Sequence, residues 1–174
     1  MRNIWFISDT HFGHENILKF VDENDNLIRP GFDSLSHMNQ RILDNITDNV
    51  KAGDTLYHLG DVYFSKEKSE SSLKQLKSMP FKKRLILGNH DDGKDKNLYD
   101  IFGKIVVWRL FKDHNFLATH VPIMPDSFRK VEYNAHGHIH EKESFSLNHI
   151  NLCVEKTNYM PVHIDDVMKY KKKY

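Results

Sequence analysis

The chain has 174 residues, of which 39% are hydrophobic and 28% are charged, and its formal net charge at neutral pH is +1. These values are ordinary for a globular protein and exclude the collagen-like, coiled-coil and intrinsically disordered classes. The length suits one domain, so we expect a single domain over residues 1–174.

The first half of the chain alternates apolar runs with amphipathic segments. The run at residues 4–7 predicts a buried strand, and residues 34–50 predict a helix whose apolar side chains form one stripe. Residues 56–59 and 85–87 predict two more strands, and a second helix is expected to begin after Ser65. This alternation is typical of an α/β protein.

The second half has strands without obvious long helices between them. Apolar runs at residues 105–110, 116–118 and 150–154 predict further strands, and a third helix is expected near residues 165–172. Because parallel neighbours need long crossover connections, closely spaced strands favour antiparallel pairing. We therefore expect a partly antiparallel sheet or a second sheet here.

Polar residues that can bind metal follow the apolar runs directly. The chain has 12 histidines, and histidine is the commonest metal ligand in proteins. Asp9 and His11 follow the first run, Asp61 the second, Asn89 the third, and His120 the run at residues 116–118. Ligands of open α/β sheets bind beyond the carboxyl ends of the strands, so these residues, distant in sequence, are predicted to converge.

Two pairs of ligand-type residues have the spacing i and i+2. Asp9 with His11, and His138 with His140, project to the same side of an extended segment, so each pair can grip one cation or two adjacent ones. The mixture of carboxylate, imidazole and amide oxygen suits Mn, Fe, Zn or Co. Glycines, which permit tight turns and close approach of the backbone, precede three of the ligand-type residues at Gly60, Gly88 and Gly137.

Five blocks of sequence carry a family resemblance. They read Asp9-x-His11, Gly60-Asp61, Gly88-Asn89-His90-Asp91, His120 and Gly137-His138-x-His140. In these blocks the sequence resembles the calcineurin-like metallophosphoesterase family, and it is most similar to small bacterial and phage members that carry Asp-Thr-His-Phe-Gly-His, here residues 9–14. One block departs from the pattern, because many members have glycine beside the histidine that corresponds to His120.

The resemblance implies an α/β fold of two mixed β-sheets packed as a sandwich and flanked by helices. It also implies two divalent metal ions, with Mn favoured over Fe, Zn, Co or Ni. His90 would stand over the substrate and act in catalysis. The ligands that the resemblance implies are Asp9, His11 and His140 for the first ion, Asn89, His120 and His138 for the second, and Asp61 as a bridge.

The function expected from these features is metal-dependent hydrolysis of phosphate esters, with small phosphodiesters or nucleotides favoured as substrates. The alternatives are a phosphomonoesterase, a nuclease and a non-catalytic metal-binding scaffold. Nucleic acid is not favoured as a partner, because no long basic stripe with interleaved aromatic residues is present. A scaffold is disfavoured because it has no need of His90, which binds no metal in the implied arrangement.

Residues near the blocks provide further candidates. His14 and Arg29 are predicted substrate contacts, although a surface position is an equal alternative for Arg29. His58 and His136 are expected to be buried partners of the ligands rather than ligands. Residues 15–33 form an insertion that could act as a partial lid.

The sequence also bears on location. The apolar N-terminal run is too short to cross a bilayer and lacks a signal-peptide cleavage pattern. Cys153 is the single cysteine, which excludes an internal disulfide and fits a reducing compartment. We therefore expect a cytoplasmic protein without membrane association, and the oligomeric state is left open.

Overall fold

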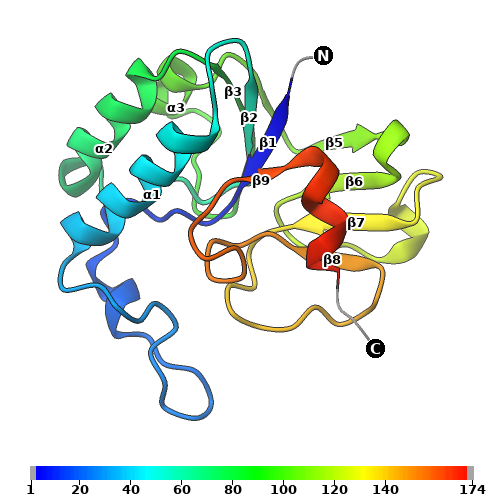
Figure 1. The fold of residues 1–174 in the computed structure, drawn as a ribbon, viewed down its shortest axis with the longest axis horizontal. Coiled ribbons are helices and arrows are strands. Elements are labelled where there is room, and N and C mark those ends of the chain that lie inside the picture. Colours follow the sequence, from blue (N-terminus) through cyan, green and yellow to red (C-terminus); the bar gives the residue numbers. More distant parts are fainter. Residues whose placement is uncertain (1–2, 172–174) are drawn as a thin grey trace.

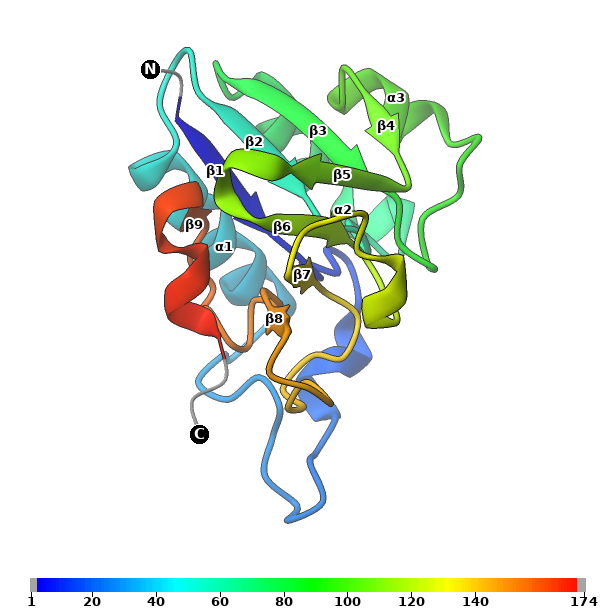
Figure 2. The ribbon, with the colours of Figure 1, turned by 90° about the vertical axis from the view of Figure 1, so that its right-hand side faces the viewer.

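Two mixed β-sheets face each other in the computed structural model, which describes residues 3–171 (Figures 1 and 2). The strand order is β4-β3-β2-β1-β9 in the first sheet and β5-β6-β7-β8 in the second. This arrangement confirms the predicted α/β fold of two mixed sheets flanked by helices. The strands are β1 (Ile4–Ile7), β2 (Thr55–His58), β3 (Lys82–Ile86), β4 (Ile105–Val106), β5 (Trp108–Phe111), β6 (Phe116–Thr119), β7 (Tyr133–His136), β8 (His149–Asn151) and β9 (Val162–His163).

Helices cover the outer face of the first sheet (Figure 1). The two helices predicted from the apolar stripe and from Ser65 are confirmed, and each begins at a serine whose hydroxyl accepts a backbone N–H of the first turn. The α-helices are α1 (Leu35–Asn49), α2 (Lys66–Ser78) and α3 (Lys96–Ile101), and the 3₁₀ helices are η1 (Glu15–Lys19), η2 (Lys112–His114), η3 (Pro125–Ser127) and η4 (Ile164–Tyr170).

A hydrophobic core lies on each face of the first sheet, because adjacent residues of β1 point to opposite sides. Ile7 packs toward α1 and α2, together with Leu56 and Leu85. Phe6 packs toward the second sheet, where its ring centroid lies 5.6 Å from that of Phe116. Burial of each such side chain contributes about 1.5–3 kcal/mol. The two cores hold in place the strand ends after which the ligand-type residues come.

The apolar run at residues 105–110 is not one strand, as the sequence had indicated. β4 pairs with β3 in the first sheet, whereas β5 pairs with β6 in the second. Val107 joins them and is 66% exposed, because the chain crosses from one sheet to the other at this residue. Hydrophobicity along the run hides this crossing, since both strands are apolar.

The second half of the chain contains elements that apolar runs do not reveal. β7 reads Tyr-Asn-Ala-His, and its buried Asn134 donates hydrogen bonds to Leu117 O at 3.0 Å and to Thr119 Oγ1 at 2.8 Å. The third predicted helix is a 3₁₀ helix over Ile164–Tyr170, and Lys172 lies outside the described residues.

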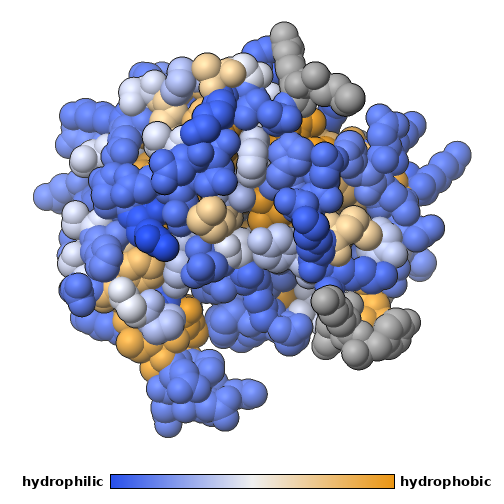
Figure 3. All heavy atoms as spheres, in the orientation of Figure 1, coloured by the Kyte–Doolittle hydropathy of each residue, from blue (hydrophilic) through white to orange (hydrophobic). Residues whose placement is uncertain are grey.

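The segment of residues 15–33 projects from the body of the protein (Figure 1). It contains η1 and a turn in which Val21 and Leu27 form a bridge. In Figure 3 the tip of this segment is hydrophilic, while apolar atoms gather where it joins the body. In residues 3–171 no helix combines the length and the apolar character needed to cross a membrane.

A buried histidine connects the end of β2 to the loop after β1. The Thr10 hydroxyl donates to Val62 O at 2.7 Å, so it must accept at 2.9 Å from His58 Nε2–H. The other ring nitrogen of His58 then accepts from Gly60 N–H at 3.2 Å. The bond from Gly60 N–H needs the neutral ring, because a protonated imidazole has no accepting nitrogen. Burial lowers the pKa of His58 to about 3.

We predict that this histidine makes the protein sensitive to acid. The unfolded chain binds a proton at His58 below about pH 6.5, whereas the folded chain does not until about pH 3. Stability is therefore lost as the pH falls between these values, by up to about 1.4 kcal/mol per pH unit. Urea unfolding of the metal-free protein at pH 7, 6, 5 and 4 should show a shallower loss of unfolding free energy for His58→Gln. Parallel curves for the two proteins would contradict the prediction.

Candidate metal site

Seven ligand-type residues converge at one edge of the sandwich. Each lies within four residues of the carboxyl end of a strand, on the loops after β1, β2, β3, β6 and β7. Backbone hydrogen bonds continue the pairing of β1 with β2 into these loops, from Asp9 N to Gly60 O at 3.0 Å and from His11 N to Asp61 O at 3.1 Å. Because the loops stay paired, side chains far apart in sequence are held close together.

The first group of possible ligands consists of Asp9, His11 and His140. One ligand atom from each lies within 4.8 Å of the others, and Asp9 and His11 are buried. His140 Nδ1 lies 2.8 Å from Glu155 Oε1, so its Nε2 is the nitrogen left to face a ligand. Two imidazoles and one carboxylate therefore meet at one point.

The second group consists of Asp61, His120 and His138. The side-chain oxygen of Asn89 lies 2.8 Å from both His120 Nε2 and His138 Nδ1, so the amide belongs to the same cluster. His120 Nδ1 contacts Leu59 O at 2.7 Å, which requires that this nitrogen carries the proton and leaves Nε2 for the cluster.

One carboxylate oxygen lies between the two groups. Asp61 Oδ2 is 3.6 Å from His11 Nε2 and 3.4 Å from His120 Nε2. Two atoms that each lie about 2.0–2.2 Å from the same ion are separated by roughly 3–4 Å. The oxygen of Asp61 therefore has the spacing of a shared ligand toward both groups.

The loops that carry the ligand-type residues adopt backbone conformations that cost free energy unless local contacts stabilise them. Left-handed φ values at residues other than glycine cost about 1–3 kcal/mol each and cluster at functional sites. Five of the seven ligand-type residues have them, namely Asp9 (57°), His11 (48°), Asp61 (55°), His138 (73°) and His140 (52°).

Buried carboxylates hold this backbone in place. Asp9 accepts from the backbone N–H of His138, at 3.1 Å and 3.0 Å from its two oxygens, which ties the loops of the two sheets together. Asp91, which belongs to the third block of the family resemblance, accepts from the N–H groups of Asp61, Val62 and Gly88. A Cβ atom on Gly88 would clash with Asp61, so only glycine lets the two loops approach this closely.

The position of Arg29 contradicts both predictions made for it, a contact with substrate and a place on the surface. The side chain is 1% exposed and donates to the backbone oxygens of Asp9 and Thr10 at 2.5 Å and 3.1 Å. It also forms an ion pair with Glu155 at 2.7 Å. Arg29 therefore supports the first ligand loop from behind and has no surface to offer a substrate.

Glu155 was missed because nothing in its sequence context resembles the five blocks. It lies after β8, is buried, and contacts both Arg29 and His140. Burial alone would raise the pKa of Glu155, but Arg29 and His140 lower it, so the side chain stays ionised. A carboxylate that accepts from a ligating histidine fixes the orientation of the ring.

His90 and His14 lie beside the two groups without belonging to either. The ring of His90 is exposed and its centroid is 5.6 Å from that of His11, while its backbone N–H donates to Asp61 Oδ1 at 2.9 Å. His14 stacks on the exposed Phe64 at 4.2 Å and lies 5.7 Å from His11. Both rings stand at the edge of the centre, where a substrate would arrive.

The electrostatics of the centre favour ionised carboxylates and a neutral His11. Burial alone would lower the pKa of His120 and His140, but their contacts with Asp61 and Glu155 raise it. Burial, reinforced by the charge of Arg29, lowers the pKa of His11 to about 2. Burial alone would raise the pKa of Asp61, but the hydrogen bond and charge of His120 hold it well below its usual value. These are the protonation states in which the two side chains can bind a metal.

The residues fit a pair of divalent ions. Both ring nitrogens of His11 are buried and have no hydrogen-bond partner within residues 3–171, although buried polar atoms are normally paired. A metal ion would satisfy one of them. The donors are carboxylates, imidazoles and one amide, a set that suits Mn, Fe, Zn or Co rather than metals that seek thiolates.

Comparisons with known proteins show which chains this one is similar to. A family model described as calcineurin-like phosphoesterase matches residues 2–160, a range that includes all seven ligand-type residues. An uncharacterized protein of Methanocaldococcus jannaschii is 31% identical over 179 residues, which cover 97% of this chain and 91% of that protein. The gene 66 protein of Mycobacterium phage L5 is 33% identical over 98 residues, covering 52% of this chain and 41% of that protein. A solved structure of a protein of unknown function from Aquifex aeolicus has a TM-score of 0.76 and 27% identity, covering 97% of this chain and 99% of that one.

We predict that the purified protein binds about two Mn ions per chain, because the ligand-type residues exceed the capacity of one tetrahedral ion. Asp61→Asn should reduce the content to about one ion or less, since it removes the charge between the groups. Elemental analysis after metal loading and gel filtration measures the content, and circular dichroism checks folding. The control is Asp48→Asn, at an exposed position on α1. One ion or fewer in the wild type would contradict a two-metal site.

Proposed function

The chain belongs to the calcineurin-like phosphoesterase family, and on this basis we propose that it hydrolyses phosphate esters with two divalent metal ions held by the two groups of ligands. The observation that carries the proposal is the position of Asp61 Oδ2 within ligand spacing of both groups. A shared carboxylate brings two ions to the short separation that phosphoryl transfer uses.

When bound, the ions would polarise the phosphoryl oxygens and lower the pKa of an attacking water. The residues of the chain prepare this centre in advance. His11 is kept neutral by burial, Asp61 is kept ionised by His120, and Glu155 fixes the ring of His140. Because Asp9 and Asp61 together would not neutralise two divalent ions, the loaded centre would keep a positive charge that attracts a phosphate group.

His90 is the proposed general acid. Its backbone N–H donates to Asp61 Oδ1, and this bond holds the residue beside the ligand groups. The ring itself is exposed and belongs to neither ligand group, and it lies near His11 and Phe64. An imidazole in this position can protonate the leaving oxygen of an ester. A non-catalytic metal scaffold has no use for such a residue.

Phosphodiesters are the proposed substrate class. Asn89 and His90 are exposed, and residues 15–33 project from the body, so both ester groups of a diester find room at the centre. A diester carries one negative charge, which the partly neutralised metal pair can balance without a further cationic side chain. Arg29, the candidate for that extra charge, is buried and paired with Glu155.

We predict that bis(p-nitrophenyl) phosphate is hydrolysed at least as well as p-nitrophenyl phosphate. The reason is that neither ligand group contains an arginine or lysine that could balance the second negative charge of a monoester. Steady-state release of p-nitrophenolate from each compound at saturating Mn gives the two values of kcat/KM. A strong preference for the monoester would move the assignment to a phosphomonoesterase.

We predict that His90→Ala lowers turnover by about 10²–10⁴-fold on diesters with basic leaving alcohols, because general acid catalysis contributes that much. The loss should be smaller with p-nitrophenolate, which departs without a proton. Nucleotide and aryl diesters are compared at equal metal content, with His37→Ala on α1 as the matched control. Equal losses on both substrates would reassign His90 to positioning, and an unaffected variant would remove its catalytic role.

A further inference from the structure

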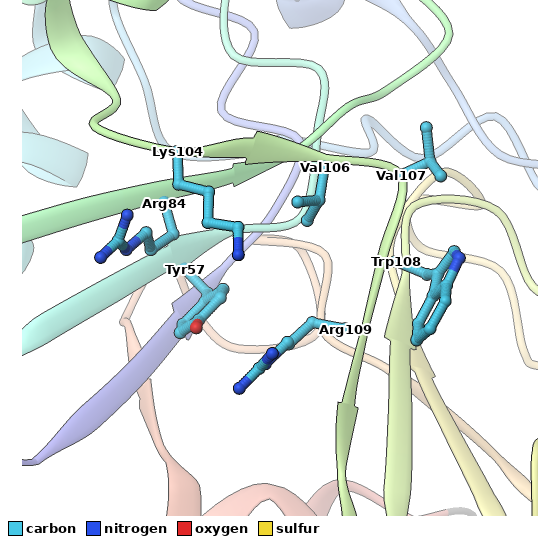
Figure 4. Close-up of a pocket in the computed structure, with 7 residues that line it drawn as sticks. All are labelled: Tyr57, Arg84, Lys104, Val106, Val107, Trp108 and Arg109. Carbon is cyan, nitrogen blue, oxygen red and sulfur yellow. The ribbon is translucent and has the colours of Figure 1, made fainter.

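A cavity of about 550 Å³ lies where the chain crosses from the first sheet to the second. Three cationic side chains line it, namely Arg84 of β3, Lys104 before β4 and Arg109 of β5. Figure 4 shows them arranged around Tyr57, with Arg109 coming from the opposite sheet. The described residues that line this cavity include no carboxylate.

The three cations have no carboxylate partner elsewhere in residues 3–171 either, and none belongs to an ion pair there. Like charges that share one cavity repel each other, so the arrangement has an electrostatic cost that an anion would remove. The net charge of the chain is +1, so this cluster concentrates positive charge at one place. A cavity lined by one sign of charge focuses its field and attracts ligands of the opposite sign.

A second cavity, of about 480 Å³, shares lining residues with the cationic cavity and also includes residues of the candidate metal site. Asn89 and His120 line one end of it, and it shares Val107 and Trp108 with the cationic cavity. Trp108 is 39% exposed. The guanidinium of Arg129 lies 4.4 Å from the centre of the Trp108 ring, which adds a fourth cation to this surface. An exposed aromatic ring with a stacked arginine thus lies between the metal site and the three cations.

We propose that single-stranded nucleic acid binds along these two cavities, with a phosphodiester at the metal site and neighbouring backbone phosphates at Arg84, Lys104 and Arg109. The proposal deepens the phosphodiesterase function and rests on it for the cleavage step. Cationic grooves that follow the backbone, combined with aromatic rings on which bases stack, are the features that bind single strands. Trp108 supplies the aromatic ring, and a base of the bound strand must be unpaired to stack on this ring.

The ends of the site lie within reach of a short oligonucleotide. Arg84 and Asn89 are five residues apart along β3 and the loop that follows it, which is at most about 16 Å. A ligand that binds the candidate metal site and the three cations together must carry more than one phosphate group, as a nucleic acid strand does. The sequence alone argued against nucleic acid because it lacks a continuous basic stripe. The fold instead brings Arg84 of β3, Lys104, Arg109 of β5 and Arg129 to two cavities that share Val107 and Trp108.

The test measures binding and catalysis separately. Anisotropy of a fluorescein-labelled twelve-residue oligothymidylate in EDTA, which prevents turnover, reports binding at several NaCl concentrations. The double variant Lys104→Ala and Arg109→Ala, at two exposed positions, should weaken binding about tenfold. It should also reduce the slope of log K against log[salt] by about 1.4. Trp108→Ala should weaken binding by roughly tenfold without changing that slope. Hydrolysis of bis(p-nitrophenyl) phosphate should stay at the wild-type rate in all of these variants.

The control removes the same charges from another face, with Arg41→Ala on α1 and Lys74→Ala on α2, and should bind as the wild type. Wild-type affinity in the Lys104 and Arg109 variant would overturn the proposal. So would equal affinity for a duplex, or full competition by tripolyphosphate combined with no effect of Trp108→Ala, which would indicate a small-anion site. If the wild type bound the oligonucleotide but did not hydrolyse the aryl diester, the catalytic function alone would be overturned.

Discussion

Buried carboxylates that accept backbone N–H groups hold the candidate metal site together. Asp9 accepts from His138 across the two sheets, and Asp91 accepts from three N–H groups on the loops after β2 and β3. These bonds hold the backbone N–H groups of Asp61 and His138, two of the five ligand-type residues in left-handed backbone. The same carboxylate of Asp9 also belongs to the first ligand group, so one side chain organises both the backbone and the ligands.

Behind the site, Arg29 and Glu155 form a buried ion pair between segments 126 residues apart. Such a pair stabilises a fold only when its other polar atoms are also satisfied. Arg29 meets this condition through the carbonyl oxygens of Asp9 and Thr10. Glu155 meets it in part, because Oε1 accepts from Arg29 and His140, whereas the buried Oε2 has no hydrogen-bond partner among residues 3–171. The pair thus connects the first ligand loop to the last one, and its energetic value depends on the arrangement of the ligands themselves.

Charge on this protein is organised locally rather than overall. The formal net charge of +1 conceals an acidic and histidine-rich candidate metal site and a nearby cavity lined by three cations. The two regions are connected through Trp108 and Val107, at the crossing between the sheets. The crossing therefore closes the sandwich and also places residues of β5 beside the metal site. A phosphate polymer would find complementary groups on both sides of it.

The sequence by itself determined the fold class, the two long helices and the residues that form the metal-site cluster, because strand ends, glycines and ligand-type side chains leave local patterns. It did not determine the roles of Arg29, Glu155 and Asp91, or the position of the three cations around Tyr57. It also missed β7 and the break at Val107. Only the tertiary structure decided these features, because they depend on which strand ends lie side by side and on which charges are buried together. Contacts between residues more than a hundred positions apart leave no local pattern in the sequence, whereas a strand followed by a ligand-type residue does.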